Sequence, residues 1–237
     1  KKVTIVRAPA GYGKTTLLLQ WLTTLKEPIA WLTIDRADSD PVRLWTYVTQ
    51  SVENALQINI DAVFVPILHS QDDAKYDFFI DSFLHELTIY NQPLHIVLDD
   101  YHLIENEQIH SMLTKFIEQL PPFIHVYLTT RTTVSLPVAK WRVKQWVQEI
   151  NTDELRFTYR EIKHFFNLKE STKVDEEQVE QISSKTEGWI AGLILMQLSA
   201  KKGLQVKQLH TEPFITEFLW QEIIRNLPQD VQYFLLH

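Results

Sequence analysis

Short apolar segments alternate with amphipathic segments over roughly the first 130 residues of the chain. The apolar runs predict β-strands over residues 3–8, 29–34, 94–98 and 123–128. The segments between them carry apolar residues at helical spacing and predict helices over residues 14–25, 76–90 and 107–120. Because strands that alternate with helices are typical of βαβ units, the pattern predicts an α/β fold with a parallel sheet flanked by helices.

Helix start signals support this pattern and extend it. Asp40 precedes Pro41, which suits an N-cap followed by the first helical position, so a helix is predicted to begin there. From about residue 152 the strand pattern ends, and Thr158 and Glu161 have the spacing of a capping box. Further helices are predicted over residues 175–185, 187–201 and 212–226, and another is predicted to start at residue 228. We therefore expect an α/β domain over residues 1–151 and a small all-helical domain over residues 152–227.

The segment between the first predicted strand and the first predicted helix carries the strongest functional signal. Residues 8–15 read Ala-Pro-Ala-Gly-Tyr-Gly-Lys-Thr and match the phosphate-loop pattern with alanine in place of its first glycine. In such a loop the main-chain N–H groups and the helix N-terminus surround phosphate oxygens. Lys14 then reaches the β- and γ-phosphates, and the Thr15 hydroxyl holds Mg²⁺. The nucleotide-binding residues predicted in this way are Ala10, Gly11, Tyr12, Gly13, Lys14, Thr15 and Thr16. The alternative is an ordinary glycine-containing turn followed by Lys-Thr by chance.

Two carboxylates follow the third predicted strand. Because ligands bind beyond the carboxyl ends of parallel strands, Asp99 and Asp100 are expected at the same sheet edge as the loop. Asp99 suits the Mg²⁺ shell, and Asp100 suits the polarisation of an attacking water. A solvated strand end with no function is the alternative for this pair.

The fourth predicted strand ends in Thr129, Thr130 and Arg131. If this strand lies between the first and the third, its polar end faces the γ-phosphate. Arg131 then stabilises charge during phosphoryl transfer. Lys14, Asp100 and Arg131 are therefore the candidate catalytic residues, and an exposed arginine at a strand end is the alternative for Arg131.

Composition excludes several other kinds of site. The 237 residues include no cysteine, which excludes disulfides, cysteine-ligated metals and thiol catalysis, and the nine histidines show no metal-ligand spacing. The net charge of −7, from 23 basic and 30 acidic residues, disfavours DNA binding by the chain as a whole. No apolar run is long enough to span a membrane, so we expect a cytoplasmic protein without membrane contacts. Only five glycines occur, and two of them lie in the predicted loop.

Further motifs occur in a specific order along most of the chain. They lie at residues 8–16, 31–35, 98–102, 129–131 and 186–193. In this order they resemble the signal-transduction ATPases with numerous domains (STAND ATPases), and more narrowly the MalT-type branch of the LuxR family of transcriptional regulators. This resemblance implies a P-loop NTPase domain, a helical domain, and a winged-helix domain that begins at residues 228–237. The chain is accordingly expected to be a fragment of a longer protein.

The resemblance also implies a mode of regulation. ATP is expected to support a self-associated active state and ADP a resting monomer, under the control of a small-molecule or protein inducer. DNA is expected to be bound only through a C-terminal domain that is absent from this chain. The leading hypothesis is therefore an ATP/ADP-binding switch module with slow Mg²⁺-dependent hydrolysis. A metabolic P-loop kinase, another NTPase unrelated to transcription, and a nucleotide-independent scaffold are the alternatives.

Overall fold

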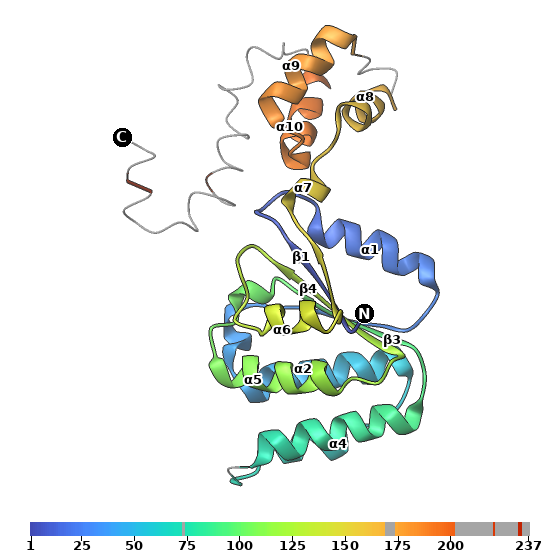
Figure 1. Ribbon diagram of the computed structural model, residues 1–237, viewed down its shortest axis with the longest axis vertical. Coiled ribbons are helices and arrows are strands. Elements are labelled where there is room, and N and C mark those ends of the chain that lie inside the picture. The colour runs from blue at the N-terminus through green and yellow to red at the C-terminus, as the bar shows by residue number, and fades with distance from the viewer. Residues whose placement is uncertain (73, 169–173, 202–219, 221–231, 234–237) are drawn as a thin grey trace. The chain divides into compact units, whose positions relative to one another are not determined.

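A computed structural model describes residues 1–72, 74–168, 174–201, 220 and 232–233 of the chain (Figure 1). The chain divides into two compact units. The first unit contains residues 1–9 and 14–151, and the second contains residues 10–13 and the chain from residue 152 onwards. The helix predicted over residues 212–226 and the segment 228–237 lie outside the described residues, apart from Trp220, Gln232 and Tyr233.

The first unit is built on one parallel sheet. Its strands are β1 (Val3–Arg7), β2 (Ile29–Thr33), β3 (Leu94–Asp99), β4 (Ile124–Thr130) and β5 (Val147–Ile150). Their order is β2-β3-β4-β1-β5, and every neighbouring pair is parallel, which confirms the predicted architecture. The strand β5 lies outside the predicted strands, because Val147 is the only buried residue among its four and no apolar run marks it.

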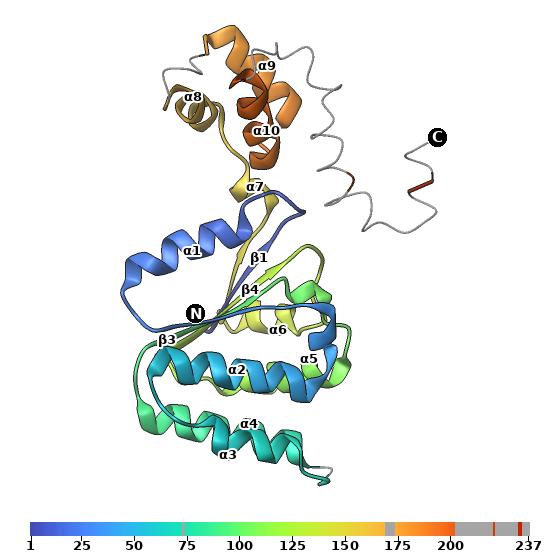
Figure 2. The same cartoon turned by 180° about the vertical axis from the view of Figure 1, so that it is seen from behind.

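Helices cover both faces of this sheet. They are α1 (Lys14–Leu25), α2 (Pro41–Leu56), α3 (Asp61–Leu68), α4 (Lys75–Tyr90), α5 (Glu107–Gln119) and α6 (Val138–Val143), with the 3₁₀ turns η1 (Arg36–Ser39) and η2 (Tyr101–Leu103). The helix α1 lies on one face, whereas α2 and α5 lie on the other, with α3 and α4 farther out (Figures 1 and 2). The predicted start of α2 is confirmed, because the side chain of Asp40 accepts the N–H of Arg43 at 2.8 Å.

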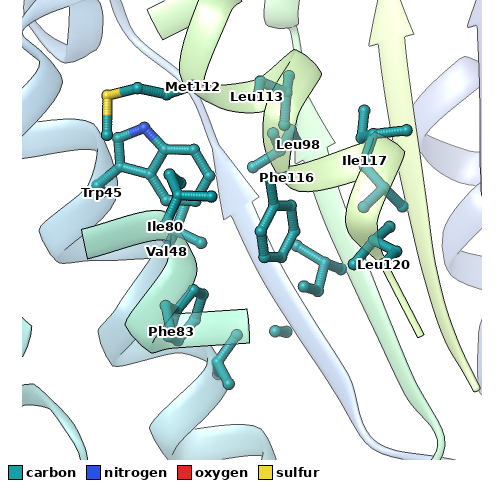
Figure 3. Close-up of a cluster of buried hydrophobic side chains, with 14 of the residues drawn as sticks. Trp45, Val48, Ile80, Phe83, Leu98, Met112, Leu113, Phe116, Ile117 and Leu120 are labelled. Carbon is teal, nitrogen blue, oxygen red and sulfur yellow. The ribbon is translucent and has the colours of Figure 1, made fainter. Parts of the chain in front are cut away.

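The main core lies between the sheet and the α2–α5 layer. Trp45 of α2 is 1% exposed and makes edge contacts with the rings of Phe79 and Phe116. Phe83 stacks on Phe116, and side chains of the strands complete the cluster (Figure 3). Offset and edge-on aromatic contacts add to the burial of apolar area, so this cluster holds the sheet and helices in place.

The second unit is helical over its described residues from 152 onwards. Its helices are α7 (Thr152–Leu155), α8 (Tyr159–Asn167), α9 (Glu176–Thr186) and α10 (Ile190–Lys201). The predicted capping box at the start of α8 is confirmed, because Thr158 and Glu161 each accept the other's backbone N–H. The helix predicted from residue 187 begins later, since Glu187 and Gly188 have φ angles of 48° and 76° and end α9 in the left-handed region. Across the described part of the chain, helices are too short or too polar to cross a bilayer.

Candidate nucleotide-binding site

The register of the sheet brings the ends of three strands together in the first unit. Leu98 of β3 pairs with Leu128 of β4, and Thr129 of β4 pairs with Val6 of β1. The carboxyl end of β1 leads into the predicted phosphate loop, and α1 resumes the first unit at Lys14. The strand order therefore meets the condition set in the sequence analysis, because β4 lies between β1 and β3.

Thr15 and Asp99 lie in direct contact, although they are 84 residues apart in the sequence. The Thr15 hydroxyl donates to both carboxylate oxygens of Asp99, at 3.1 and 2.9 Å. Asp99 is 2% exposed, so its carboxylate depends on such donors. A hydroxyl and a carboxylate are hard oxygen ligands of the kind that Mg²⁺ prefers, and Mg²⁺ sites use only one or two carboxylates beside phosphate oxygens. The Thr15–Asp99 pair therefore fits Mg²⁺. Within the described residues, no group of three or more His, Asp or Glu side chains lies close enough together to hold a metal ion.

Lys14 is the buried cation of this site. It is 7% exposed, and its Nζ donates to the carbonyl oxygen of Pro9 at 3.1 Å. Burial lowers the pKa of Lys14, the charges of Asp100 and Asp99 oppose this, and the charge of Arg131 adds to it. The structure therefore brings the three predicted catalytic residues close enough to interact electrostatically.

Asp100 leaves the strand in an unusual conformation. Its φ and ψ angles of 59° and 39° lie in the left-handed region, which residues with a Cβ rarely adopt. Its Oδ1 lies 3.7 Å from Nδ1 of His102 in η2. Burial lowers the pKa of His102, Asp100 raises it, and Arg131 and Lys14 lower it further. The imidazole is therefore mostly uncharged at neutral pH.

His102 lies beside Asp100, although the histidines were weighed from the sequence only as metal ligands. The available signal was its position two residues after Asp100, because a short turn at a strand end keeps such residues close together. An uncharged imidazole near a carboxylate can accept or pass on a proton. His102 therefore joins Asp100 as a group able to handle protons at this edge.

The two threonines at the end of β4 differ in what they contact. The Thr129 hydroxyl donates to Asp99 Oδ1 at 2.5 Å and accepts the backbone N–H of Asp100 at 2.8 Å. The Thr130 hydroxyl donates to the carbonyl oxygen of Thr132 at 2.8 Å. Both hydroxyl protons are used within the protein, so neither threonine hydroxyl is left to donate to a phosphate.

The tip of the predicted loop, residues 10–13, belongs to the second unit. Gly11 and Gly13 have φ angles of 76° and 77°, which explains the use of glycine at both positions. Within this unit, the Ala10 and Gly11 carbonyl oxygens accept hydrogen bonds from the Trp189 indole N–H and the Ala191 backbone N–H, each at 3.0 Å. Both bonds use carbonyl oxygens of the loop. Phosphate oxygens are bound by backbone N–H groups, and neither bond uses an N–H group of the loop. Of the other predicted loop residues, Tyr12 is half-buried and Thr16 is exposed.

Comparison with known proteins adds a family context to this geometry. No family model matches the chain. HTH-type transcriptional regulators named MalT, from Serratia proteamaculans, Vibrio campbellii and Vibrio cholerae, are each 29% identical to it over 242 residues, or 99% of this chain. The chain is therefore similar to these regulators over nearly its whole length. It spans about a quarter of those relatives, 26% of the first and 27% of the other two.

A solved structure supports the fold of the chain independently. The Orc1 protein of Aeropyrum pernix, solved in complex with DNA, has a TM-score of 0.54 and 13% sequence identity. The similarity covers 99% of this chain and 65% of the Orc1 chain. At this identity the likeness concerns the fold alone, and together with the strand order it confirms the predicted α/β fold with a parallel sheet flanked by helices.

Proposed function

We propose that this chain is an ATP/ADP-binding switch module of a signal-responsive transcriptional regulator. The observation that carries this proposal is the hydrogen bond from the Thr15 hydroxyl to the Asp99 carboxylate, with the Lys14 ammonium beside the same acidic edge. A helix that starts with Lys-Thr directly after a glycine-containing loop, opposite a buried carboxylate, suits a nucleotide polyphosphate and its cation.

Each residue at the edge has a defined part in this proposal. Thr15 and Asp99 would hold Mg²⁺, which supplies charge neutralisation to the phosphates when it is bound. Lys14 binds the β- and γ-phosphates as a fixed cation, while the N–H groups of residues 10–13 surround phosphate oxygens. Asp100 orients the attacking water and accepts its proton, and His102 is positioned to share that proton. Arg131 stabilises charge on the transferred phosphoryl group.

Hydrolysis in such a module serves regulation. ATP would favour a self-associated active state of the full-length protein, and hydrolysis to ADP would return it to a resting monomer. The relatives are named HTH-type transcriptional regulators, and this chain spans about a quarter of their length. We therefore assign DNA binding and inducer recognition to parts of the protein beyond this chain, whose net charge of −7 disfavours DNA contacts.

Calorimetric titration with ATP and ADP, with and without Mg²⁺, tests the proposal directly. We expect both nucleotides to bind, and Mg²⁺ to strengthen ATP binding. In parallel, Asp100→Asn is expected to bind Mg-ATP like the wild type but to release phosphate about 10² to 10⁴ times more slowly, the range for loss of a general base. Asp153→Asn, a change of the same kind at an exposed residue of α7, is the matched control and is expected to leave hydrolysis unchanged.

Two results would contradict the proposal. A wild-type chain that binds neither nucleotide would favour a scaffold in which the motifs serve structure alone. Phosphate transfer to a panel of hydroxylated acceptors that exceeds hydrolysis would favour a metabolic kinase instead.

A further inference from the structure

Thr129 links the two acidic residues that end β3. It is fully buried on β4, next to β3 in the sheet. Its hydroxyl is 2.5 Å from Asp99 Oδ1 and 2.8 Å from the backbone nitrogen of Asp100. A single side chain from a neighbouring strand thus contacts both residues at once, one through its carboxylate and the other through its main chain.

The direction of these two hydrogen bonds follows from the groups involved. An ionised carboxylate can only accept, and a backbone N–H can only donate. The single hydroxyl proton of Thr129 is therefore directed at Asp99, and an oxygen lone pair receives the N–H of Asp100. No donor is left on Thr129 for a phosphate oxygen, so its contribution has to be made through the two acids.

Each acid needs such a contact for a different reason. Asp99 also accepts from Thr15, but in the proposed function the oxygen of Thr15 is used by a cation. The bond from Thr129 to Oδ1 is independent of that ligand and holds the carboxylate from the neighbouring strand. Asp100 has a φ angle of 59°, which is disfavoured for a residue with a Cβ. Its N–H bond to Thr129 ties that conformation to the rigid sheet.

We propose that Thr129 is a positioning residue for ATP hydrolysis, which orients Asp99 toward the cation and holds Asp100 in the conformation that directs its carboxylate at the water. The inference rests on the proposed nucleotide-binding function. Thr129→Val removes the hydroxyl and keeps the shape of the side chain. Thr129→Ala also removes the hydroxyl and leaves a smaller side chain, so it adds no bulk at the site. Thr129→Ser keeps the hydroxyl and is the rescue variant.

Thr4→Val is the matched control. Thr4 lies on β1, is 5% exposed, and bonds through its hydroxyl to Nε2 of His125 at 2.9 Å. Its register partner is Tyr127, two residues before Thr129 on β4, so it lies on the same face of the sheet but away from the acids. Any general effect of removing a buried strand hydroxyl should appear in this variant as well.

Three measurements separate a positioning role from a merely structural one. In the nucleotide-free chain, amide hydrogen exchange at Asp100 should become at least about fivefold faster in Thr129→Val and Thr129→Ala, because the N–H loses its partner. ATP affinity without Mg²⁺ should stay within about twofold of that of the wild type. The increase in ATP affinity on adding Mg²⁺ should be about fivefold smaller than in the wild type. The kcat for hydrolysis should fall by about 10²-fold, the loss expected for a displaced catalytic group, with little change in KM. Thr129→Ser and Thr4→Val should resemble the wild type in all three measurements.

The outcomes distinguish this inference from the function on which it rests. A wild-type chain that binds no ATP would overturn the proposed function, and with it the role of Thr129 in hydrolysis. The role of Thr129 alone would be overturned if the wild type hydrolyses ATP and both Thr129→Val and Thr129→Ala match it. They would have to match it in amide exchange at Asp100, in the increase of ATP affinity on adding Mg²⁺, and in kcat. Equal losses in Thr129→Ser and Thr129→Val would also overturn it, because the hydroxyl would then not be the group that matters.

Discussion

Replacement of Lys14 by methionine isolates the contribution of one charge to nucleotide binding. The substitution keeps a side chain of similar length in a position that is 7% exposed, and it removes the ammonium group. In the structure one N–H of that ammonium is directed at the carbonyl oxygen of Pro9, at 3.1 Å. An ammonium has three donors, so about two remain for phosphate oxygens.

The expected loss follows from those two donors. A hydrogen bond that involves a charged group contributes about 1.5–3 kcal/mol, so two of them contribute about 3–6 kcal/mol. Since about 1.4 kcal/mol corresponds to a factor of ten, ATP should bind Lys14→Met about 10² to 10⁴ times more weakly.

Thermal unfolding with and without Mg-ATP measures this loss. At an ATP concentration about 100 times the wild-type Kd, binding stabilises the native state by about 2.7 kcal/mol, and for a variant with 100-fold weaker binding by only about 0.4 kcal/mol. In a chain of this size each kcal/mol raises Tm by about 2–4 °C, so the ATP-dependent shift should fall from about 5–11 °C to about 1–2 °C. Because each protein is compared with itself, any effect of the substitution on the nucleotide-free fold cancels.

Lys26→Met is the matched control for this experiment. Lys26 is exposed and directly follows α1, so the control makes the same change of charge about 18 Å along the helix from Lys14. Its ATP-dependent shift should equal that of the wild type. A full shift in Lys14→Met would contradict this prediction, because the buried ammonium would then not contact the phosphates.

Three further predictions concern the stability of the fold. Trp45→Ala should lower the free energy of unfolding in urea by about 3–5 kcal/mol, whereas Trp21→Ala, at a site 44% exposed, should cost far less; equal losses would contradict the core described here. Thr158→Ala removes the capping box of α8 and should lower Tm by about 2–4 °C, since an N-cap contributes about 1 kcal/mol, and an unchanged Tm would show that the cap does not stabilise the second unit. Burial lowers the pKa of His125 from 6.5 to about 4, so the unfolded chain binds more protons between these values. The free energy of unfolding should therefore fall as the pH drops from 6.5 to 4, and His125→Gln should flatten that dependence; parallel pH profiles of the two proteins would rule this out.

Local sequence patterns were sufficient to predict those elements whose start signals and apolar spacing lie within the element itself. The helix α1 has the predicted bounds, and Asp40 caps α2 as expected, because an N-cap and an apolar stripe lie within a few residues of each other. The phosphate-loop motif can be recognised for the same reason, since its residues are contiguous. The strand β5 carries no such mark, because it is short, and it is recognised only through its pairing with β1.

The contacts of the site depend on long-range pairing and were only partly predictable. The sequence placed Asp99 and the loop at one edge by the general rule for parallel sheets, but the partner of the Asp99 carboxylate depends on the register of β3 against β4. Thr129 was therefore expected to face a phosphate, whereas its hydroxyl bonds to the two acids. The contact of Trp189 with the carbonyl oxygen of Ala10 spans 179 residues, and no local pattern could indicate it.

The left-handed conformation of Asp100 explains how two consecutive carboxylates can serve one site. Successive side chains of a strand point to opposite faces of the sheet, so two adjacent acids in extended conformation would lie on opposite sides. Asp99 takes the position set by the strand, is 2% exposed and meets Thr15 of α1. Asp100 reverses the sign of φ, and its side chain, 30% exposed, interacts with Lys14 and His102. In the proposed function, one residue of left-handed backbone thus separates two roles: the buried Asp99 would be the fixed ligand of a cation, and the partly exposed Asp100 would reach the attacking water.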